Sequence, residues 1–200
     1  MLKLYDREAS GNAYKVRLLL AFLDIPYERI PVSMKDGKNL VDDGYRRLNP
    51  RGQIPTLQDG EFSLWGSTAI LCYLASRYDG TGCWLPRDPA PFGHVMQWLE
   101  LAQNEIQTGL FRARAIVHLG IAGDLEAAHE TARQALDVLE SRLGTETWLA
   151  GPGPTVADIA CFPYVALAQQ GQVDTSSYAG VRRWIAGFKA LDRFVGMPGI

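Results

Sequence analysis

Two polar residues near the N-terminus stand where side chains often bind anions. Ser10 and Asn12 follow Leu2–Tyr5, whose alternating apolar residues predict a short strand, and precede a pattern that predicts a helix. A hydroxyl or amide at such a junction can donate a hydrogen bond to a thiolate. The helix dipole also favours the anion and lowers a thiol's pKa from its free value of about 8.5. Plain helix capping is the alternative role for both residues.

A second candidate site is the segment 49–57, in which Ile54 precedes Pro55 just before a predicted strand. Proline removes most of the trans preference of the preceding peptide bond, so this bond can be cis. A cis bond would turn the N–H and C=O of Ile54 outward, where they could pair with an extended peptide as a strand does. An ordinary loop with a trans bond is the alternative, and for an isolated Ile-Pro step it is the commoner one.

A third candidate is Ser67, which stands at the start of a predicted helix. Free N–H groups and the positive end of the helix dipole make such a place suitable for a carboxylate. The alternative is that Ser67 is an ordinary N-cap, the commoner role of a lone serine at a helix start.

The elements that would carry these residues alternate between strand and helix patterns. We expect the order strand, helix, strand, helix, strand, strand, helix, which implies a mixed sheet with helices packed on it. Asp59-Gly60 is a strong hairpin signal between the last two strands. The expected elements are strands at 2–5, 27–32, 56–58 and 62–65 and helices at about 13–23, 41–48 and 67–78.

The rest of the chain has helical patterns only. We predict a first domain at 1–79, a Gly- and Pro-containing linker at 80–89 and an all-helical domain at 90–200. The first helix of that domain is expected to run from about Phe92 past Gly109 toward His118. Further helices are expected at 125–143, at 155–168 and from Val181 to Leu191, and the nearly all-apolar one at 155–168 should be buried on most sides.

Composition narrows the classes of function. The 200 residues carry a net charge of −2 and no long basic run, which disfavours nucleic acid as a partner. The three cysteines form no C-x-x-C and the three histidines form no close pair, so we expect no metal site. Neither a signal-peptide pattern nor an apolar run of bilayer length is visible, so we expect no membrane partner and a cytoplasmic location.

In this order and spacing, these segments resemble the cytosolic glutathione transferase family. The stretch 49–55 matches that family's N-P-x-G-x-[VI]-P, and 66–70 matches its [ED]-S-x-A-I apart from the first position. The stretch 148–151, followed by 154–159, matches its L-A-G…[ST]-x-A-D segment. The resemblance covers nearly the whole chain. It implies an α/β plus all-α protein, with a thioredoxin-like N-terminal domain and a helical C-terminal domain.

The resemblance also implies where glutathione would bind. Main-chain groups of Ile54 would bind its cysteinyl part, and Ser67 would hold its γ-glutamyl carboxylate. Gln53 would lie near the γ-glutamyl end, and Lys38 is a weaker candidate for the glycyl carboxylate. Gly66 departs from the family, which has an acidic residue or glutamine there, and losing that side chain should weaken glutathione binding by about 1.5–3 kcal/mol.

The group that activates the thiolate varies among branches of the family. Cysteine is excluded, because none lies near residue 10. Ser10 is favoured and Asn12 is second, since Ser-x-Asn at a helix start resembles the bacterial serine and asparagine types. Tyr5, on the first predicted strand, is the next candidate.

A second substrate would lie between the domains, against the helix that carries Trp98, Glu105, Phe111, Arg112 and Arg114. Phe111 and Arg114 are our candidates, because residues 112 and 114 are two apart on a helix and cannot both face the cleft. Pro55 is assigned a structural role. So are Thr155 and Asp158, which stand three apart at a helix start and can cap each other's N–H groups.

The implied function is a glutathione transferase that activates the thiol of glutathione for attack on a small-molecule electrophile. Glutathione would be a co-substrate, and a homodimer is the implied assembly. A glutathione-dependent disulfide or peroxide reductase is one alternative. A non-catalytic protein that kept the fold is another, and Gly66 is the feature that supports it.

Overall fold

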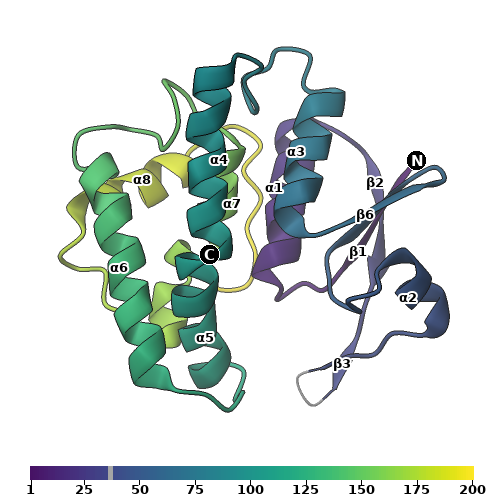
Figure 1. Ribbon diagram of the computed structural model, residues 1–200, viewed down its shortest axis with the longest axis horizontal. Helices are drawn as coiled ribbons and strands as arrows, with labels where there is room; N and C mark the ends of the chain where they lie inside the picture. The colour runs from purple at the N-terminus through teal and green to yellow at the C-terminus, as the bar shows by residue number, and fades with distance from the viewer. Residues whose placement is uncertain (36–37) are drawn as a thin grey trace.

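A computed structural model describes residues 1–35 and 38–200 (Figure 1). It contains a thioredoxin-like domain with a mixed sheet, followed by a helical domain, and this confirms the predicted fold class. Among the described residues, no helix combines the length and the apolar character needed to span a bilayer.

The sheet of the first domain has four strands in the order β2-β1-β5-β6. Strand β1 pairs in parallel with β2 and antiparallel with β5, and the β5–β6 hairpin turns at Gly60-Glu61, between the paired Asp59 and Phe62. Leu4 of β1 lies opposite Leu57 of β5, and both are fully buried. The strands are β1 (Leu2–Asp6), β2 (Tyr27–Pro31), β5 (Thr56–Asp59) and β6 (Phe62–Trp65).

Helices lie on both sides of this sheet (Figure 1). Helices α1 (Gly11–Phe22) and α3 (Ser67–Tyr78) lie between the sheet and the helical domain, whereas α2 (Asp43–Leu48) lies beyond the sheet. The structure adds one feature that was not predicted, a short antiparallel pair formed by β3 (Met34–Lys35) and β4 (Lys38–Asn39).

The helical domain differs from prediction in its first helix, which is not continuous. Helix α4 (Pro89–Gln103) ends at Asn104, and a π-helical turn, η1 (Ile106–Phe111), leads into α5 (Arg112–Val117). Gly109 of this turn lies so close to α6 that a Cβ built on it would be 2.5 Å from the main-chain nitrogen of Ala132. A pattern of apolar residues does not reveal this close approach between two backbones.

The helix predicted at 125–143 is confirmed without a shift, the next two predicted helices have shifted ends, and the structure adds a separate short 3-10 turn, η2. These elements are α6 (Leu125–Leu143), α7 (Val156–Ala166), η2 (Ala168–Gly171) and α8 (Ala179–Lys189). Every residue of α7 from Val156 to Val165 is buried, as its apolar composition predicts. The helix begins with a reciprocal capping pair, in which Thr155 caps the first turn and the Asp158 carboxylate accepts from the Thr155 N–H at 2.9 Å.

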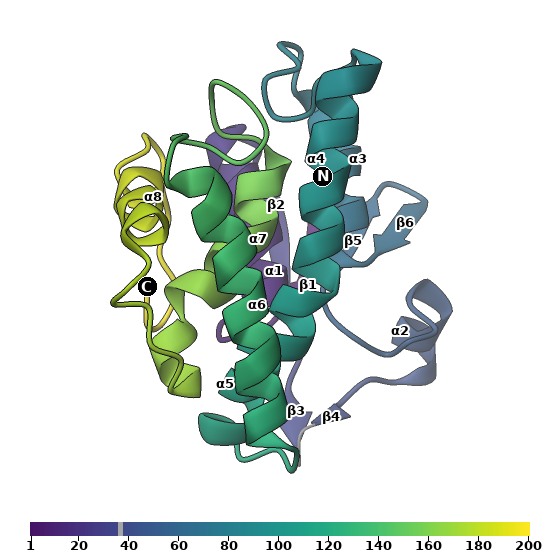
Figure 2. The same ribbon diagram turned by 60° about the vertical axis from the view of Figure 1, so that its left-hand side comes forward.

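The two domains meet along α1 and α7, which lie side by side in both views (Figures 1 and 2). Tyr164 of α7 packs directly on the first turn of α1, and a Cβ built on Gly11 would be 2.6 Å from its ring. Glycine at this position therefore lets the helical domain approach the segment that carries Ser10 and Asn12.

Candidate active site

A cavity with a volume of about 480 Å³ opens between the two domains. In the first domain its walls come from the β1–α1 loop, β3 and β4, the loop before β5, and the end of β6 with the start of α3. In the helical domain they come from the end of α4, η1, α5 with the loop after it, and α7. Nine of the candidates from the sequence line it, namely Ser10, Asn12, Gln53, Ile54, Pro55, Gly66, Ser67, Phe111 and Arg114. The cavity thus collects polar groups from segments that are far apart in the sequence.

The loop before β5 presents main-chain groups to the cavity. The Ile54–Pro55 peptide bond is cis. Asn49, which is buried, donates from its amide to the Gln53 carbonyl at 2.7 Å and to Thr56 Oγ1 at 3.0 Å, and so holds both ends of the turn. Within the described residues, neither the N–H nor the C=O of Ile54 takes part in a hydrogen bond. Both groups therefore remain available to an extended ligand.

The start of α3 forms the next part of the wall. Gly66 occupies the N-cap position with φ +91°, and Ser67 is the first residue of the helix. The alternative that Ser67 is a plain N-cap is therefore wrong, because the residue before it holds that position and makes no side-chain bond. Ser67 is 5% exposed, and its hydroxyl donates to Asn12 Oδ1 at 3.4 Å. The free N–H groups of the first turn of α3 lie beside it.

Ser10 and Asn12 make different contacts. Ser10 is the N-cap of α1, and its Oγ accepts from the Ala13 N–H at 3.2 Å. Asn12 lies between the domains, because it accepts from Ser67 and donates to Gln107 Oε1 at 3.4 Å. Capping uses a lone pair of the Ser10 hydroxyl and leaves its hydrogen free to donate.

Two other candidates are placed differently. Tyr5 does not line the cavity: its hydroxyl donates to Gln58 Oε1 at 2.8 Å on the neighbouring strand. The main chain of Lys38 belongs to β4, whereas its side chain lies outside what the structure describes.

On the helical side, only part of the expected wall faces the cavity. Phe111 and Arg114 line it, whereas Arg112 turns away and donates to the Ala122 carbonyl at 2.8 Å. Trp98 and Glu105 belong to the helix that was expected to line the cleft, but neither lines the cavity. Trp98 is buried in the core of the helical domain, and the π-helical turn changes which residues face the cavity after α4.

Several lining residues have no counterpart among the sequence candidates. Arg7 donates to Asn39 Oδ1 at 2.9 Å, and the Arg51 guanidinium lies 5.5 Å from the centre of the Trp65 ring. Further additions include Gln107 of η1 and Tyr164 of α7. The arginine in the N-P-R-G-Q stretch was a signal for Arg51, while the others are brought in only by the packing of separate elements.

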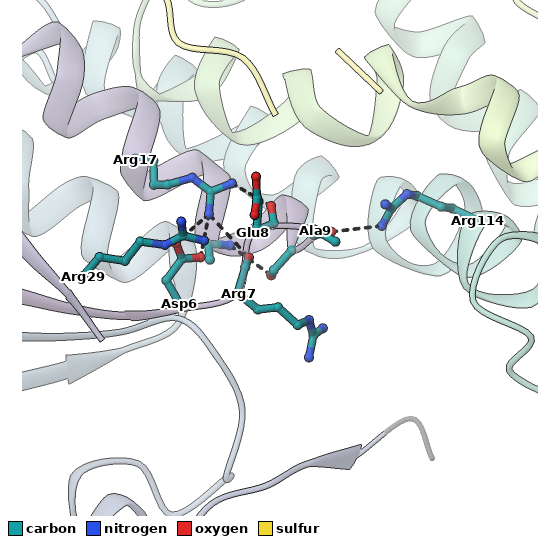
Figure 3. Close-up of polar contacts among 9 residues, drawn as sticks. Asp6, Arg7, Glu8, Ala9, Arg17, Arg29 and Arg114 are labelled. Carbon is teal, nitrogen blue, oxygen red and sulfur yellow. Dashed lines mark hydrogen bonds and ion pairs between the residues drawn. The ribbon is translucent and has the colours of Figure 1, made fainter. Parts of the chain in front are cut away.

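The loop that precedes Ser10 is held from both domains (Figure 3). The buried Asp6 carboxylate pairs with Arg17 at 2.6 Å and with Arg29 at 2.5 Å, and Arg17 also donates to the Glu8 carbonyl at 2.9 Å. From the other side, Arg114 reaches the Ala9 carbonyl at 3.4 Å. The loop that carries Ser10 is therefore held by ion pairs within the first domain and by a hydrogen bond from the helical domain.

Comparison with known proteins fits this geometry. The glutathione S-transferase N-terminal domain matches residues 4–82 and the C-terminal domain matches residues 122–194. The chain is therefore a member of the glutathione S-transferase family.

Individual relatives are similar to this chain over most of their length. A glutathione S-transferase from Pseudomonas fluorescens has a TM-score of 0.90 at 33% identity, and 98% of each chain is covered. Glutathione S-transferase GstB of Escherichia coli is 32% identical over 174 residues, 82% of either chain. Disulfide-bond oxidoreductase YfcG of Escherichia coli is 28% identical over 183 residues, 86% of this chain and 83% of its own.

Proposed function

We propose that this protein binds glutathione in the cavity and activates its thiol for attack on a small-molecule electrophile. The observation that carries the proposal is that, within the described residues, the N–H and C=O of Ile54 form no hydrogen bond, and Ile54 lines the same cavity as Ser67 and Ser10. With the cysteinyl part of glutathione paired to Ile54 as an added strand, its γ-glutamyl end would reach the start of α3 and its thiol would reach the β1–α1 loop.

Each end of glutathione then has a partner of the right chemistry. The γ-glutamyl carboxylate would accept from Ser67 and from the first N–H groups of α3, where the helix dipole favours an anion. Gln53 would contact the same end, and Lys38 is our candidate for the glycyl carboxylate. Ser10 would donate its free hydroxyl hydrogen to the thiolate, with Asn12 as the second candidate, as in a serine or asparagine type of the family.

The reaction forms one bond and breaks one. The thiolate sulfur attacks the electrophilic carbon beside Phe111, a carbon–sulfur bond forms, and the leaving group departs with its electron pair. The thiol proton passes to solvent when the thiolate forms. Stabilising the thiolate is the part of this reaction that Ser10 and the start of α1 would supply.

A disulfide reductase is the second candidate, supported by the similarity to the oxidoreductase YfcG. Among the described residues, none that lines the cavity is a cysteine, so glutathione itself would supply the sulfur that is oxidised.

The test is a set of turnover assays with glutathione and an aromatic halide, a peroxide or a mixed disulfide, alongside calorimetric titration of glutathione. We expect glutathione to bind and the halide to be the best substrate. Preferred turnover of the disulfide would favour the reductase. Binding without any turnover would point to a non-catalytic role, and absence of binding would refute the proposal.

We also propose that the protein is a homodimer, as is typical of the family. Sedimentation should give twice the chain mass of 22.1 kDa over a wide range of concentrations. A constant mass of one chain would contradict this assembly.

A further inference from the structure

The charged side chains that line the cavity are all positive among the described residues. Three arginines line it, Arg7, Arg51 and Arg114, and no aspartate or glutamate is among the described lining residues. Arg51 lies against Trp65, on the side of the loop before β5, where glutathione is proposed to bind. Figure 3 shows Arg7 within the loop that ends at Ser10 and Arg114 reaching that loop from the helical domain.

Arg114 is the most deeply buried of these charges. Only 2% of its surface is exposed. Its guanidinium donates to Gln170 Oε1 at 2.6 Å and to the Ala9 carbonyl at 3.4 Å, both of which are neutral acceptors. Within the described residues it forms no ion pair with a carboxylate. Burying a cation without a partner anion costs free energy. A bound anion would therefore be strongly stabilised by the Arg114 guanidinium.

The carboxylates of glutathione do not account for Arg114. The γ-glutamyl carboxylate is proposed to lie at Ser67, on the other domain. Arg114 instead shares a helix face with Phe111, since the two are three residues apart. The Phe111 ring packs on Tyr164 at 5.0 Å between centroids, which gives this part of the cavity an aromatic wall beside the guanidinium.

We propose that the second substrate is an electrophile that carries a carboxylate, with its apolar body on Phe111 and its carboxylate on Arg114. A guanidinium presents paired N–H groups that match a carboxylate, and a neutral substrate would leave the buried charge unpaired. Arg7, half-buried and bonded to the neutral Asn39 side chain, adds positive charge on the same side of the loop. This inference rests on the proposed glutathione-dependent reaction and specifies its substrate class.

The test uses two substrates of nearly equal shape, 4-chloro-3-nitrobenzoate and 4-chloro-3-nitrobenzamide. For each, kcat/KM is divided by the uncatalysed rate with glutathione, which removes the difference in intrinsic reactivity. We expect the wild type to prefer the benzoate. In Arg114→Gln this preference should fall by about ten- to a hundredfold, the range typical for a hydrogen bond to a charged group.

Two further variants separate charge from structure. Arg114→Lys keeps the charge without the paired donors and should retain part of the preference. Arg112→Gln lies two residues away, outside the cavity wall, and should keep the full preference. If Arg114→Gln does not fold, inhibition of the wild type by 4-nitrobenzoate and by 4-nitrobenzamide gives the same comparison, and equal inhibition would overturn the inference.

The outcomes distinguish this inference from the function on which it rests. Turnover of both substrates with an equal preference in wild type and Arg114→Gln would refute the anionic substrate and leave the transferase intact. Failure to bind glutathione, measured by calorimetry, would refute the transferase and with it the inference. A preference that falls only in the Arg114 variants supports both.

Discussion

Ser10 and Asn12 offer different free atoms to a ligand in the cavity. The Ser10 hydroxyl accepts one bond from the first turn of α1 and keeps its hydrogen. The Asn12 amide is already shared between Ser67 and Gln107, so it joins the two domains. Ser10 is therefore the better donor to a thiolate, and Asn12 is better suited to bridging the two domains.

We therefore expect Ser10→Ala to raise the pKa of the bound thiol and to slow turnover by about 10²–10³, the usual effect of removing one donor to a developing anion. Glutathione affinity should change little. Thiolate absorbance of the bound complex against pH measures the pKa directly. Asn12→Ala is the matched comparison, and if only that variant shifts the titration, Asn12 is the activating residue.

Gly66 gives a second prediction at the scale of one residue. Its φ of +91° is one that L-residues rarely adopt, but a Cβ added there would meet only Ala69 Cβ, at 4.0 Å. Gly66→Glu should therefore lose about 1–2 kcal/mol of stability from backbone strain, yet tighten glutathione binding by adding a carboxylate near the γ-glutamyl end.

Gly66→Ala is the control, since it carries the strain without the carboxylate. Denaturant unfolding should show equal losses in the two variants, and calorimetry should show tighter binding only for Gly66→Glu. Equal affinities in both variants would mean that another group already fills this role.

At the scale of the element, α7 depends on one buried carboxylate. Asp158 accepts from the N–H of Thr155 at 2.9 Å, from the N–H of Leu149 at 3.1 Å and from Trp184 Nε1 at 3.0 Å. Burial raises the pKa of Asp158, and these hydrogen bonds oppose that rise. The residue thus ties the start of α7 to α8 and to the preceding loop.

Asp158→Ala should destabilise the protein by at least about 3 kcal/mol, because it removes a cap and leaves several buried donors without a partner. Asp124→Ala is the matched variant: Asp124 caps the exposed start of α6 through one bond to Ala127, and its loss should cost about 1 kcal/mol. Urea unfolding measures both. Similar losses in the two variants would contradict the tying role of Asp158.

At the scale of the molecule, an ammonium group is buried where the domains meet. Lys15 of α1 is fully buried, its Nζ forms no hydrogen bond within the described residues, and it lies 5.3 Å from the centre of the Tyr164 ring of α7. Burial lowers its pKa to about 8, with the nearby Cys161 opposing this shift. Burial also raises the pKa of Tyr164, so the tyrosine stays neutral beside it.

This lowered pKa makes stability depend on pH in a defined window. Below pH 8 the lysine is charged in both states, and the folded state carries the full cost of its burial. Between pH 8 and 10.5 the unfolded state holds more protons, so the contribution of Lys15 to the free energy of unfolding rises with pH, by up to about 3 kcal/mol.

Lys15→Met should therefore be more stable than wild type at pH 7, by about 1–3 kcal/mol, and the difference should shrink toward pH 10. Urea unfolding of both proteins across this range measures it. Lys3→Met, at an exposed lysine of β1, should follow the wild type at every pH. Parallel curves for wild type and Lys15→Met would show that the ammonium is compensated in solution.

The local elements of this protein follow from short stretches of its sequence. The alternating apolar residues of β1, the hairpin signal at Asp59-Gly60 and the spacing of Thr155 and Asp158 all depend on neighbours within a few residues, so a one-dimensional pattern contains them. The same holds for the polar residues at helix starts and for the loop at Ile54, which were identified from their place between a strand and a helix.

The packing of distant elements sets which of these residues meet and what charge surrounds them. The π-helical turn, the close approach of Gly11 to Tyr164 and the cation at Lys15 all result from contacts between elements far apart in the chain. Arg7 and Arg114 are 107 positions apart, yet the packing of α5 on the β1–α1 loop brings both to one cavity. Cavity shape and uncompensated charge belong to that packing, and no short segment of sequence contains them.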